Sequence, residues 1–191
     1  MTFLYIVRCN FTAPDQEQAW NDWYSGPKIE QMLRKPHFLS CQRFRRAAGS
    51  GRDYLALWTL DSPDAFQTEQ YTSDWGFFEW ERFVTDWSRD LFDGGAAGWR
   101  EFAVERSGAL EVVSFDGMIA AEANAARAHV AAPDTMWLPV AGLDRRTPLI
   151  GLRVLAAGAS AAPQGDGKLA MQRATYRPIS DFQTAAHRAT A

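Results

Sequence analysis

The chain has 191 residues, of which 47% are hydrophobic and 13% aromatic, and it carries a formal net charge of −3. This length suits one large domain or two small ones, and the aromatic content excludes a largely disordered chain. Because the basic residues are scattered through an acidic chain, the sequence lacks the electrostatic signature of a nucleic-acid-binding protein.

The cysteines and the apolar runs of the sequence indicate in which cellular compartment the protein is expected. The two cysteines, Cys9 and Cys41, both lie in strand-like apolar runs and are expected to be reduced core thiols. No leading segment resembles a signal peptide, and no apolar run approaches the roughly 20 residues needed to cross a bilayer. We therefore expect a cytoplasmic protein with no membrane contact.

The first elements are a strand and a helix. Residues 3–10 are rich in β-forming residues and predict a buried strand. Thr12 or Asp15 can cap the helix that follows, and Pro14 suits its first turn. The helix is expected to continue into the next segment, with Gly26-Pro27 as a place where it can break.

The segment from Trp23 to Arg46, WYSGPKIEQMLRKPHFLSCQRFRR, predicts a helix, a tight corner and a strand. Apolar residues recur at helical spacing before Pro36, which ends the helix, and a strand-like run begins at Phe38. The three arginines near its end, Arg43, Arg45 and Arg46, are interpreted as a solvated strand end.

This segment resembles one found in dimeric α+β barrel proteins, the ferredoxin-like group that includes EthD-type, antibiotic-biosynthesis-monooxygenase-type and stress-responsive barrels. In those proteins the pattern is Trp-Tyr, a His, an amphipathic helix, Pro-Gly-Phe and a strand. Here Lys28 stands where the helix His is common, and His37 stands where the Gly of Pro-Gly-Phe is common. The resemblance implies the fold more than a function, since such folds serve enzymes and non-enzymes.

The rest of the first half completes a β-α-β-β-α-β order. RDYLALWTL, residues 52–60, predicts a third strand, and Ser62-Pro63-Asp64-Ala65 predicts a helix start. Trp80, Phe83 and Trp87 fall at helical spacing and predict a second helix that ends at Gly94-Gly95. GWREFAVER, residues 98–106, is then the fourth strand, which gives the ferredoxin-like order.

The second half contains weak matches to the first. LYIVRCN from residue 4 matches LEVVSFD from residue 110, RRAAGSG from residue 45 resembles VLAAGAS from residue 154, and TLDSPDAFQT from residue 59 resembles TYRPISDFQT from residue 175. Three matches in chain order suggest a repeat. The second copy is expected to have strands at 109–115, 136–140, 149–157 and 168–176, a helix near 118–131 and a truncated terminal helix at 180–189, with no room for a full second helix and fourth strand.

We therefore predict an α+β protein with two ferredoxin-like β-α-β-β-α-β units, 1–107 and 108–191, the second degenerate. Each unit covers one sheet face with helices and leaves an apolar face that a second sheet must bury. Packing the two antiparallel sheets against each other gives a pseudo-dimeric α+β barrel within one chain. A homodimer through other surfaces stays open.

The candidate acid/base residues are His37, Tyr24 and Lys28. His37 is expected at the mouth end of a strand, where an imidazole could transfer a proton near neutral pH; the alternative is a loop histidine that caps the turn. Tyr24 and Lys28 are one helical turn apart and can face one cavity, Tyr24 as a donor and Lys28 as an anion contact or base. A packed ring and a solvated ammonium are the alternative. The remaining histidines, His129 and His187, are weaker candidates.

The candidate ligand-binding residues are Tyr5 and Trp58 on neighbouring strands, together with Trp75, Phe77 and Trp80 in the aromatic segment. Core packing is the alternative for Tyr5 and Trp58, and core or an oligomer contact is the alternative for the aromatic segment. The spacing of the three histidines matches no metal-binding pattern, so no metal and no cofactor are expected.

Two classes of function fit these features. The first is a cofactor-independent enzyme, a lyase, isomerase or cyclase, acting on a small hydrophobic carbonyl or phenolic compound through acid/base residues; this follows from the family resemblance. The second is a non-catalytic small-molecule-binding or stress-response barrel. A haem-handling barrel is a third hypothesis, which lacks a histidine clearly placed as an axial ligand.

Overall fold

The computed structural model describes residues 1–96, 98–130, 133–158 and 171–186. Its helical segments are α1 (Glu17–Trp23), a π-helical turn (Tyr24–Lys28), α2 (Ile29–Leu33), a 3-10 turn (Pro63–Gln67), α3 (Glu69–Thr72), two further 3-10 turns (Phe78–Phe83 and Trp99–Glu101) and α4 (Ala120–Arg127). Its strands are β1 (Phe3–Phe11), β2 (Phe38–Gly49), β3 (Tyr54–Leu60), β4 (Val84–Asp93), β5 (Ala109–Ser114), β6 (Met136–Leu143), β7 (Leu149–Leu155), β8 (Gln172–Pro178) and β9 (Gln183–Thr184).

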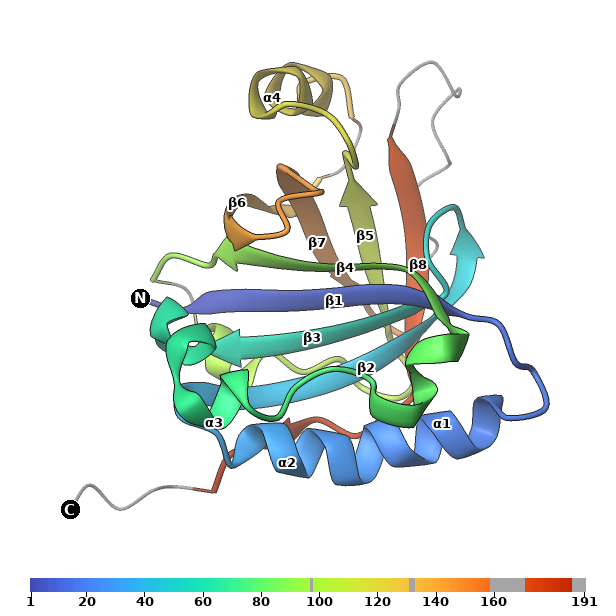
Figure 1. Ribbon diagram of the computed structural model, residues 1–191. Coiled ribbons are helices and arrows are strands. Elements are labelled where there is room, and N and C mark those ends of the chain that lie inside the picture. Colours follow the sequence, from blue (N-terminus) through green and yellow to red (C-terminus); the bar gives the residue numbers. More distant parts are fainter. Residues whose placement is uncertain (97, 131–132, 159–170, 187–191) are drawn as a thin grey trace.

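Eight of these strands close into an antiparallel barrel (Figure 1). The order runs β3-β1-β4-β6-β7-β5-β8-β2, and pairing of β2 with β3 closes the ring. The short β9 pairs with the first part of β2 at Ser40 and Cys41, while β8 pairs with its second part. The predicted α+β class and antiparallel barrel are thus confirmed.

The strand order is the same in both halves of the chain. In the first half it is β4-β1-β3-β2, and in the second it is β8-β5-β7-β6, with the first strand of each half in the centre. The expectation that the second half has no room for a fourth strand is wrong, because β5, β6, β7 and β8 are all present. The terminal helix expected at 180–189 is also wrong in its described part, where β9 lies; residues 187–189 lie outside the described residues.

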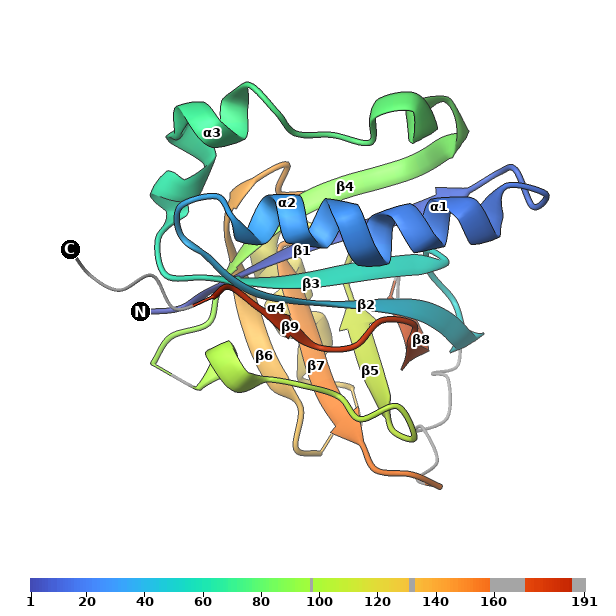
Figure 2. The same ribbon diagram turned by 90° about the horizontal axis from the view of Figure 1, so that it is seen from below.

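Alternation along the strands creates two apolar layers in the first half. On β1, Leu4 and Ile6 face the barrel interior with Phe44 and Phe92. The side chains between them, such as Tyr5, face outward and pack under the α1–α2 helix. Figure 2 shows this helix running along the sheet, over β1 and beside β3. In the second half, α4 packs a smaller cluster against β5 and β7.

The aromatic segment folds differently from the sequence prediction. The helix expected through Trp80, Phe83 and Trp87 is a 3-10 turn at Phe78–Phe83 followed by β4, and the strand expected at 98–106 contains only a 3-10 turn. The spacing of the rings resembles a helix stripe, but from Trp87 onward the chain alternates between inward Ser88 and Asp90 and outward Arg89. The β-pairing of this run with β1 decides its structure.

Arg43 also departs from its prediction. It is buried beneath α1 and the π-helical turn, where it donates hydrogen bonds to the Asn21 carbonyl (3.1 Å), the Asn21 side chain (2.9 Å) and Ser25 (2.9 Å). Its guanidinium lies over the Tyr24 ring at 4.2 Å. The solvated strand end therefore consists of Arg45 and Arg46 alone, which pair with Glu17 and Asp53.

Candidate functional site

A cavity lies between the α1–α2 helix and the outer face of the first-half strands. It contains about 380 Å³ of empty space, including its opening to solvent. Residues from β1, β3, β4, the helix, α3 and the segment after α3 line it: Tyr5, Val7, Tyr24, Lys28, Met32, Trp58, Tyr71, Trp75, Gly76, Phe77, Trp87 and Arg89. Seven of these twelve residues are aromatic, so the cavity suits a flat apolar ligand.

Six residues predicted from the sequence meet in this cavity. They are Tyr5, Tyr24, Lys28, Trp58, Trp75 and Phe77. Trp80 does not line it; its ring packs beside Phe11 and Trp23 at the far end of the helix. The expectation that Tyr24 and Lys28 share one cavity agrees with the structure, while their chemical roles stay predictions.

A π-helical turn sets the positions of Tyr24 and Lys28. Residues Tyr24–Lys28 include Gly26 and Pro27, and the helix passes through them without the break that this pair could have caused. A π turn holds one extra residue, which rotates the following side chains relative to a regular α-helix, and such turns are frequent at functional sites. Both Tyr24 and Lys28 are buried against the sheet side.

Six lining residues were not predicted, and three of them carry the polar and aromatic character of this wall: Tyr71, Trp87 and Arg89. The Arg89 guanidinium lies 4.4 Å from the Trp75 ring centre and donates to the Tyr71 hydroxyl at 3.4 Å. The Tyr71 hydroxyl is also 3.4 Å from that of Tyr5. The sequence signal for Arg89 and Trp87 is the period-two alternation of β4, which places both on the same outward face.

Lys28 and Arg89 are the charged residues among those that line the cavity, and both are basic. Burial lowers the pKa of Lys28 from 10.5 to about 8, partly opposed by Asp74 and reinforced by Lys35. Burial raises the pKa of Tyr5 well above its usual value, with the neighbouring Tyr71 adding to the rise. Burial likewise raises the pKa of Tyr24, although Arg43 opposes it. Both tyrosines therefore stay protonated donors at neutral pH.

Two hydrogen-bond donors in the cavity walls have no acceptor. The Trp58 Nε1 and the Arg89 Nε are buried and form no hydrogen bond of normal geometry within the described residues. A looser side-chain contact from Trp58 to Tyr24 lowers the pKa of Tyr24. An unsatisfied buried donor costs about 1–3 kcal/mol. A ligand oxygen accepting from either would remove that cost, so the cavity favours a ligand that carries acceptors.

No protein-family model matches the chain, and no curated protein is significantly similar to it. Solved structures do match. An anthrone oxidase-like protein aligns with TM-score 0.58 and 11% identity over 100% of this chain and 96% of its own. A presumed monooxygenase from Lactobacillus acidophilus NCFM aligns with TM-score 0.54 and 10% identity over 97% and 98%, and one from Fusobacterium nucleatum subsp. nucleatum ATCC 25586 with 0.52 and 9% over 100% and 98%.

The chain shares the fold of these three proteins, an antiparallel α+β barrel. Identities near 10% show the fold and nothing finer, so the EthD-type assignment stays a prediction. The coverage of nearly the full length in both directions means that both halves of this barrel take part in the likeness.

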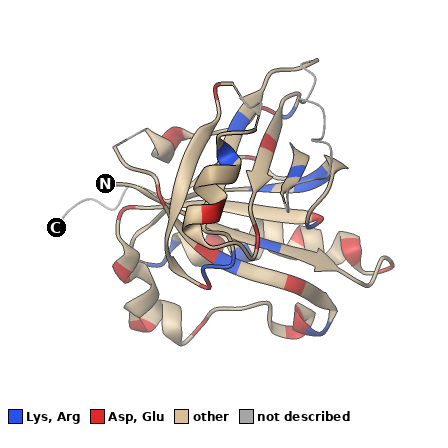
Figure 3. Ribbon diagram, turned by 90° about the horizontal axis from the view of Figure 1, so that it is seen from above, with Lys and Arg blue, Asp and Glu red and all other residues tan. Residues whose placement is uncertain are grey.

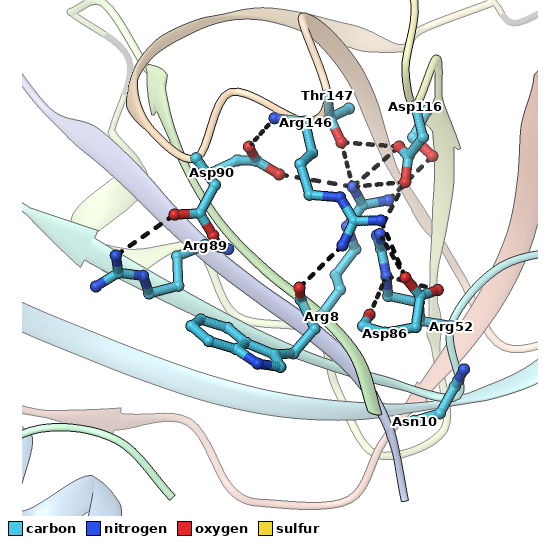
Figure 4. A network of polar contacts seen from close by, with 12 residues as sticks. Arg8, Asn10, Arg52, Asp86, Arg89, Asp90, Asp116, Arg146 and Thr147 are labelled. Carbon is cyan, nitrogen blue, oxygen red and sulfur yellow. Dashed lines mark hydrogen bonds and ion pairs between the residues drawn. The ribbon is translucent and has the colours of Figure 1, made fainter. Parts of the chain in front are cut away.

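Apart from the cavity, the structure contains a buried network of polar side chains (Figure 4). Arg8 is 2% exposed and donates to Ser114 (3.0 Å), to Asp116 (3.0 Å) and to Thr147. Its guanidinium is also 3.8 Å from Asp90, whose pKa burial raises. Arg8 and Asp90 come from the first half and the other three residues from the second, so the cluster joins the halves.

Burial would raise the pKa of Asp116, but Arg8, Thr147 and Arg52 together lower it below its usual range. Arg52 binds Asp116 at 2.9 Å and also pairs with Asp86. Most polar atoms of the cluster are paired within it, although Arg8 Nε and Asp90 Oδ2 are buried and form no hydrogen bond within the described residues. The pairs that do form link strands of the two halves of the barrel.

Elsewhere in the described residues, the charged residues, histidines and cysteines form no metal-binding cluster. Acidic and basic residues are interspersed along the chain (Figure 3). Within the described residues, no three His, Cys, Asp or Glu side chains are arranged to hold a metal ion, and no helix is long and apolar enough to cross a membrane. Cys9 and Cys41 are free and buried, whereas His187 lies outside the described residues.

His37 lies at the exposed corner between α2 and β2, not in the cavity wall. Its Nδ1 is 2.8 Å from the Asp61 carboxylate. Its φ of 70° is in the left-handed region, where glycine is favoured. This geometry matches the turn-capping alternative, and the role of His37 in proton transfer stays an untested prediction.

We expect His37→Gly to keep or raise stability. Removing the side chain relieves a left-handed strain of about 1–2 kcal/mol and loses one solvent-accessible hydrogen bond to Asp61, worth at most about 1 kcal/mol. Urea denaturation of the wild type, His37→Gly and His37→Val measures this. His37→Val, branched at Cβ, should be the least stable of the three; a His37→Gly protein less stable than His37→Val would contradict the strain argument.

Proposed function

We propose that the barrel binds and acts on a small aromatic compound bearing a carbonyl or phenolic oxygen, in the cavity beneath the α1–α2 helix. One observation supports this most. Seven aromatic side chains line the cavity, and two wall residues, Trp58 and Arg89, each have a buried N–H group without a hydrogen-bond acceptor among the described residues. The rings would hold the ligand's apolar part. The free donors and the two basic groups would hold its oxygen.

The proposed chemistry is acid/base catalysis without a cofactor. Lys28, uncharged above about pH 8, would accept a proton from a phenol or from the carbon beside a carbonyl. Arg89, with its contact to Tyr71, would stabilise the negative charge that then develops on the ligand oxygen. Lyase, isomerase and cyclase reactions of carbonyl and phenolic compounds can begin with such a step.

The names of the structural neighbours support the ligand class. One is described as anthrone oxidase-like and two as monooxygenases. An anthrone is a fused-ring aromatic ketone, which is the kind of molecule that a cavity with these walls would accept. This support is by analogy of fold.

Non-catalytic binding is the second candidate, and the tyrosines favour it. Tyr5 and Tyr24 have raised pKa values, so neither transfers a proton readily at neutral pH. If Lys28 serves only to hold an anionic oxygen, the barrel is a binding protein. The haem-handling hypothesis gains no support, because neither described histidine, His37 or His129, lines the cavity.

The test uses binding of 2-naphthol and 2-naphthaldehyde, followed by tryptophan fluorescence and calorimetry. Val7→Phe and Met32→Phe, both in the cavity wall, should abolish binding by filling the space, provided circular dichroism shows that they fold. His37→Ala, outside the wall, is the matched control and should bind like the wild type. Binding that survives both filling variants would refute the cavity as the site.

Turnover separates the two candidates. With a ligand that binds, product formation or exchange of the proton beside the carbonyl is followed by mass spectrometry or NMR. Removing a positioned base typically lowers such a rate by about 100- to 10,000-fold, so Lys28→Met should lose the reaction if the barrel is an enzyme. Binding without any exchange in the wild type would support a binding protein.

We propose further that residues 1–107 and 108–191 are two ferredoxin-like units, the second reduced, that arose by duplication. The identical strand order of the two halves supports this. The first sequence match, at residues 4 and 110, joins the central strands β1 and β5. The other two matches join elements that are not equivalent, so they do not contribute. The described cavity belongs to the first unit.

A further inference from the structure

Two lysines are buried on the same side of the first helix, and their surroundings differ. Lys35 Nζ donates to the carbonyls of Gln70 and Asp74, the latter at 2.7 Å, and lies 3.5 Å from the Asp74 carboxylate. Lys28 is 5% exposed and donates to Gln31 Oε1 at 3.2 Å. Lys35 thus has a carboxylate partner, whereas Lys28 has no carboxylate within ion-pair distance among the described residues.

The Lys28 amine is also placed to meet a ligand. The Lys28 side chain belongs to the cavity wall. Its Nζ is also 4.8 Å from the centre of the ring of Phe78, a residue that is not part of that wall. The cavity opens to solvent, and the other groups that line it near the amine are mostly aromatic. A primary amine that is desolvated, lacks a fixed counter-ion and faces an apolar cavity is the arrangement that makes a lysine nucleophilic.

We infer that Lys28 forms a covalent imine with an aromatic aldehyde or ketone bound in the cavity. This deepens the proposed function and rests on it, since the carbonyl compound must first enter the same cavity. Phenolic ligands, which have no electrophilic carbon, would be bound without a covalent bond.

The step balances as a condensation. The lone pair of the neutral Nζ attacks the carbonyl carbon, and the carbonyl π electrons move to oxygen, which gains a proton and gives a carbinolamine. Loss of the hydroxyl as water, after a second proton transfer, leaves the C=N bond. The two protons lost by nitrogen leave with the oxygen as one water molecule, and no oxidant or reductant takes part.

Several groups set the charge state of Lys28. Burial is the main cause that lowers its pKa to about 8, Asp74 opposes it, and Lys35 reinforces it. Arg89 and Tyr5 line the same cavity, but neither is among the groups that shift the pKa of Lys28. Relative to a lysine of pKa 10.5, a pKa near 8 gives roughly 300-fold more neutral amine at pH 7.

The chain suits a trapping experiment because it contains only three lysines, Lys28, Lys35 and Lys168. The full-length protein is equilibrated with 2-naphthaldehyde at a series of pH values and quenched with sodium borohydride, which reduces the imine to a stable amine. Each trapped aldehyde adds its own mass less one oxygen atom. Intact-mass and peptide mass spectrometry then locate the adduct.

We expect one adduct, on Lys28, formed at least tenfold more than on Lys35, Lys168 or the N-terminal amine at pH 7. Its yield should rise as the pH rises through about 8, because deprotonation creates the nucleophile. Lys28→Met and Lys28→Arg should both abolish it. The Arg variant keeps the positive charge and serves if the Met variant fails to fold.

Binding of 2-naphthol, which cannot form an imine, separates this inference from the proposed function. If 2-naphthol binds but the aldehyde is not trapped on Lys28, or labels all amines equally, the imine is refuted and the cavity stands. If neither compound binds, the proposed function fails together with the imine.

Discussion

Arg8→Met is expected to lower the free energy of unfolding by about 3 kcal/mol. The substitution removes the guanidinium that lies between Asp90 and Asp116 and leaves both carboxylates in the barrel interior. Breaking a buried ion pair from one side costs roughly 3–5 kcal/mol, because the remaining charge has lost its partner. The lower value is expected because Asp116 keeps Arg52 at 2.9 Å and Asp90 keeps the backbone N–H of Arg146 at 2.8 Å.

Two arginines provide the controls for this measurement. Arg43 is as buried as Arg8 but binds neutral oxygens only, so Arg43→Met leaves no charge behind and should cost less, about 1–2 kcal/mol. Arg146 is 47% exposed and pairs with Asp86 at the surface, so Arg146→Met should cost at most about 1 kcal/mol. Urea denaturation of all four proteins gives the order. Equal losses for Arg8→Met and Arg43→Met would refute the argument from unpaired charge.

The local part of the first half was predictable from its sequence. Pro36 ends the helix and the strand resumes at Phe38, as the structure has it. Local rules suffice there, since proline removes a hydrogen bond whatever the rest of the chain does. Because Tyr24 and Lys28 are a turn apart on that helix, and Tyr5 and Trp58 lie on adjacent strands, their meeting in one cavity was also predictable.

The aromatic segment was not predictable by the same means. Trp80, Phe83 and Trp87 have helical spacing, yet Trp87 lies on a strand. What decides this is the pairing of β4 with β1 and β6, between residues 48 to 90 positions apart in the chain. The missed residues Trp87 and Arg89 follow directly, since a helix assignment conceals which side chains share the outward face.

Buried arginines show a further limit of sequence reasoning. Arg8 and Arg43 sit in strand patterns where a solvent-facing charge is the usual interpretation. Their burial depends on partners from distant segments: Asp116 for Arg8, and Asn21 on the helix for Arg43. Spacing within a strand shows on which face of the sheet a side chain lies. Only the folded barrel shows whether that face is exposed to solvent.

The last prediction concerns Arg89, the residue expected to recognise the ligand oxygen. Its guanidinium lies in the cavity wall beside Trp75 and has a buried Nε without an acceptor. A hydrogen bond from a charged donor contributes about 1.5–3 kcal/mol, so Arg89→Met should weaken binding of 2-naphthol by roughly 10- to 150-fold. Calorimetric titration of wild type and variant measures it.

The contrast between ligands makes this prediction specific. Naphthalene fills the same apolar space but carries no oxygen, so its affinity should be nearly the same for wild type and Arg89→Met. Arg45→Met is the matched control, because Arg45 lies on β2 outside the cavity and pairs with Glu17 at 3.0 Å. If Arg89→Met weakens naphthalene as much as 2-naphthol, Arg89 supports the walls through its stacking on Trp75 and does not recognise the oxygen.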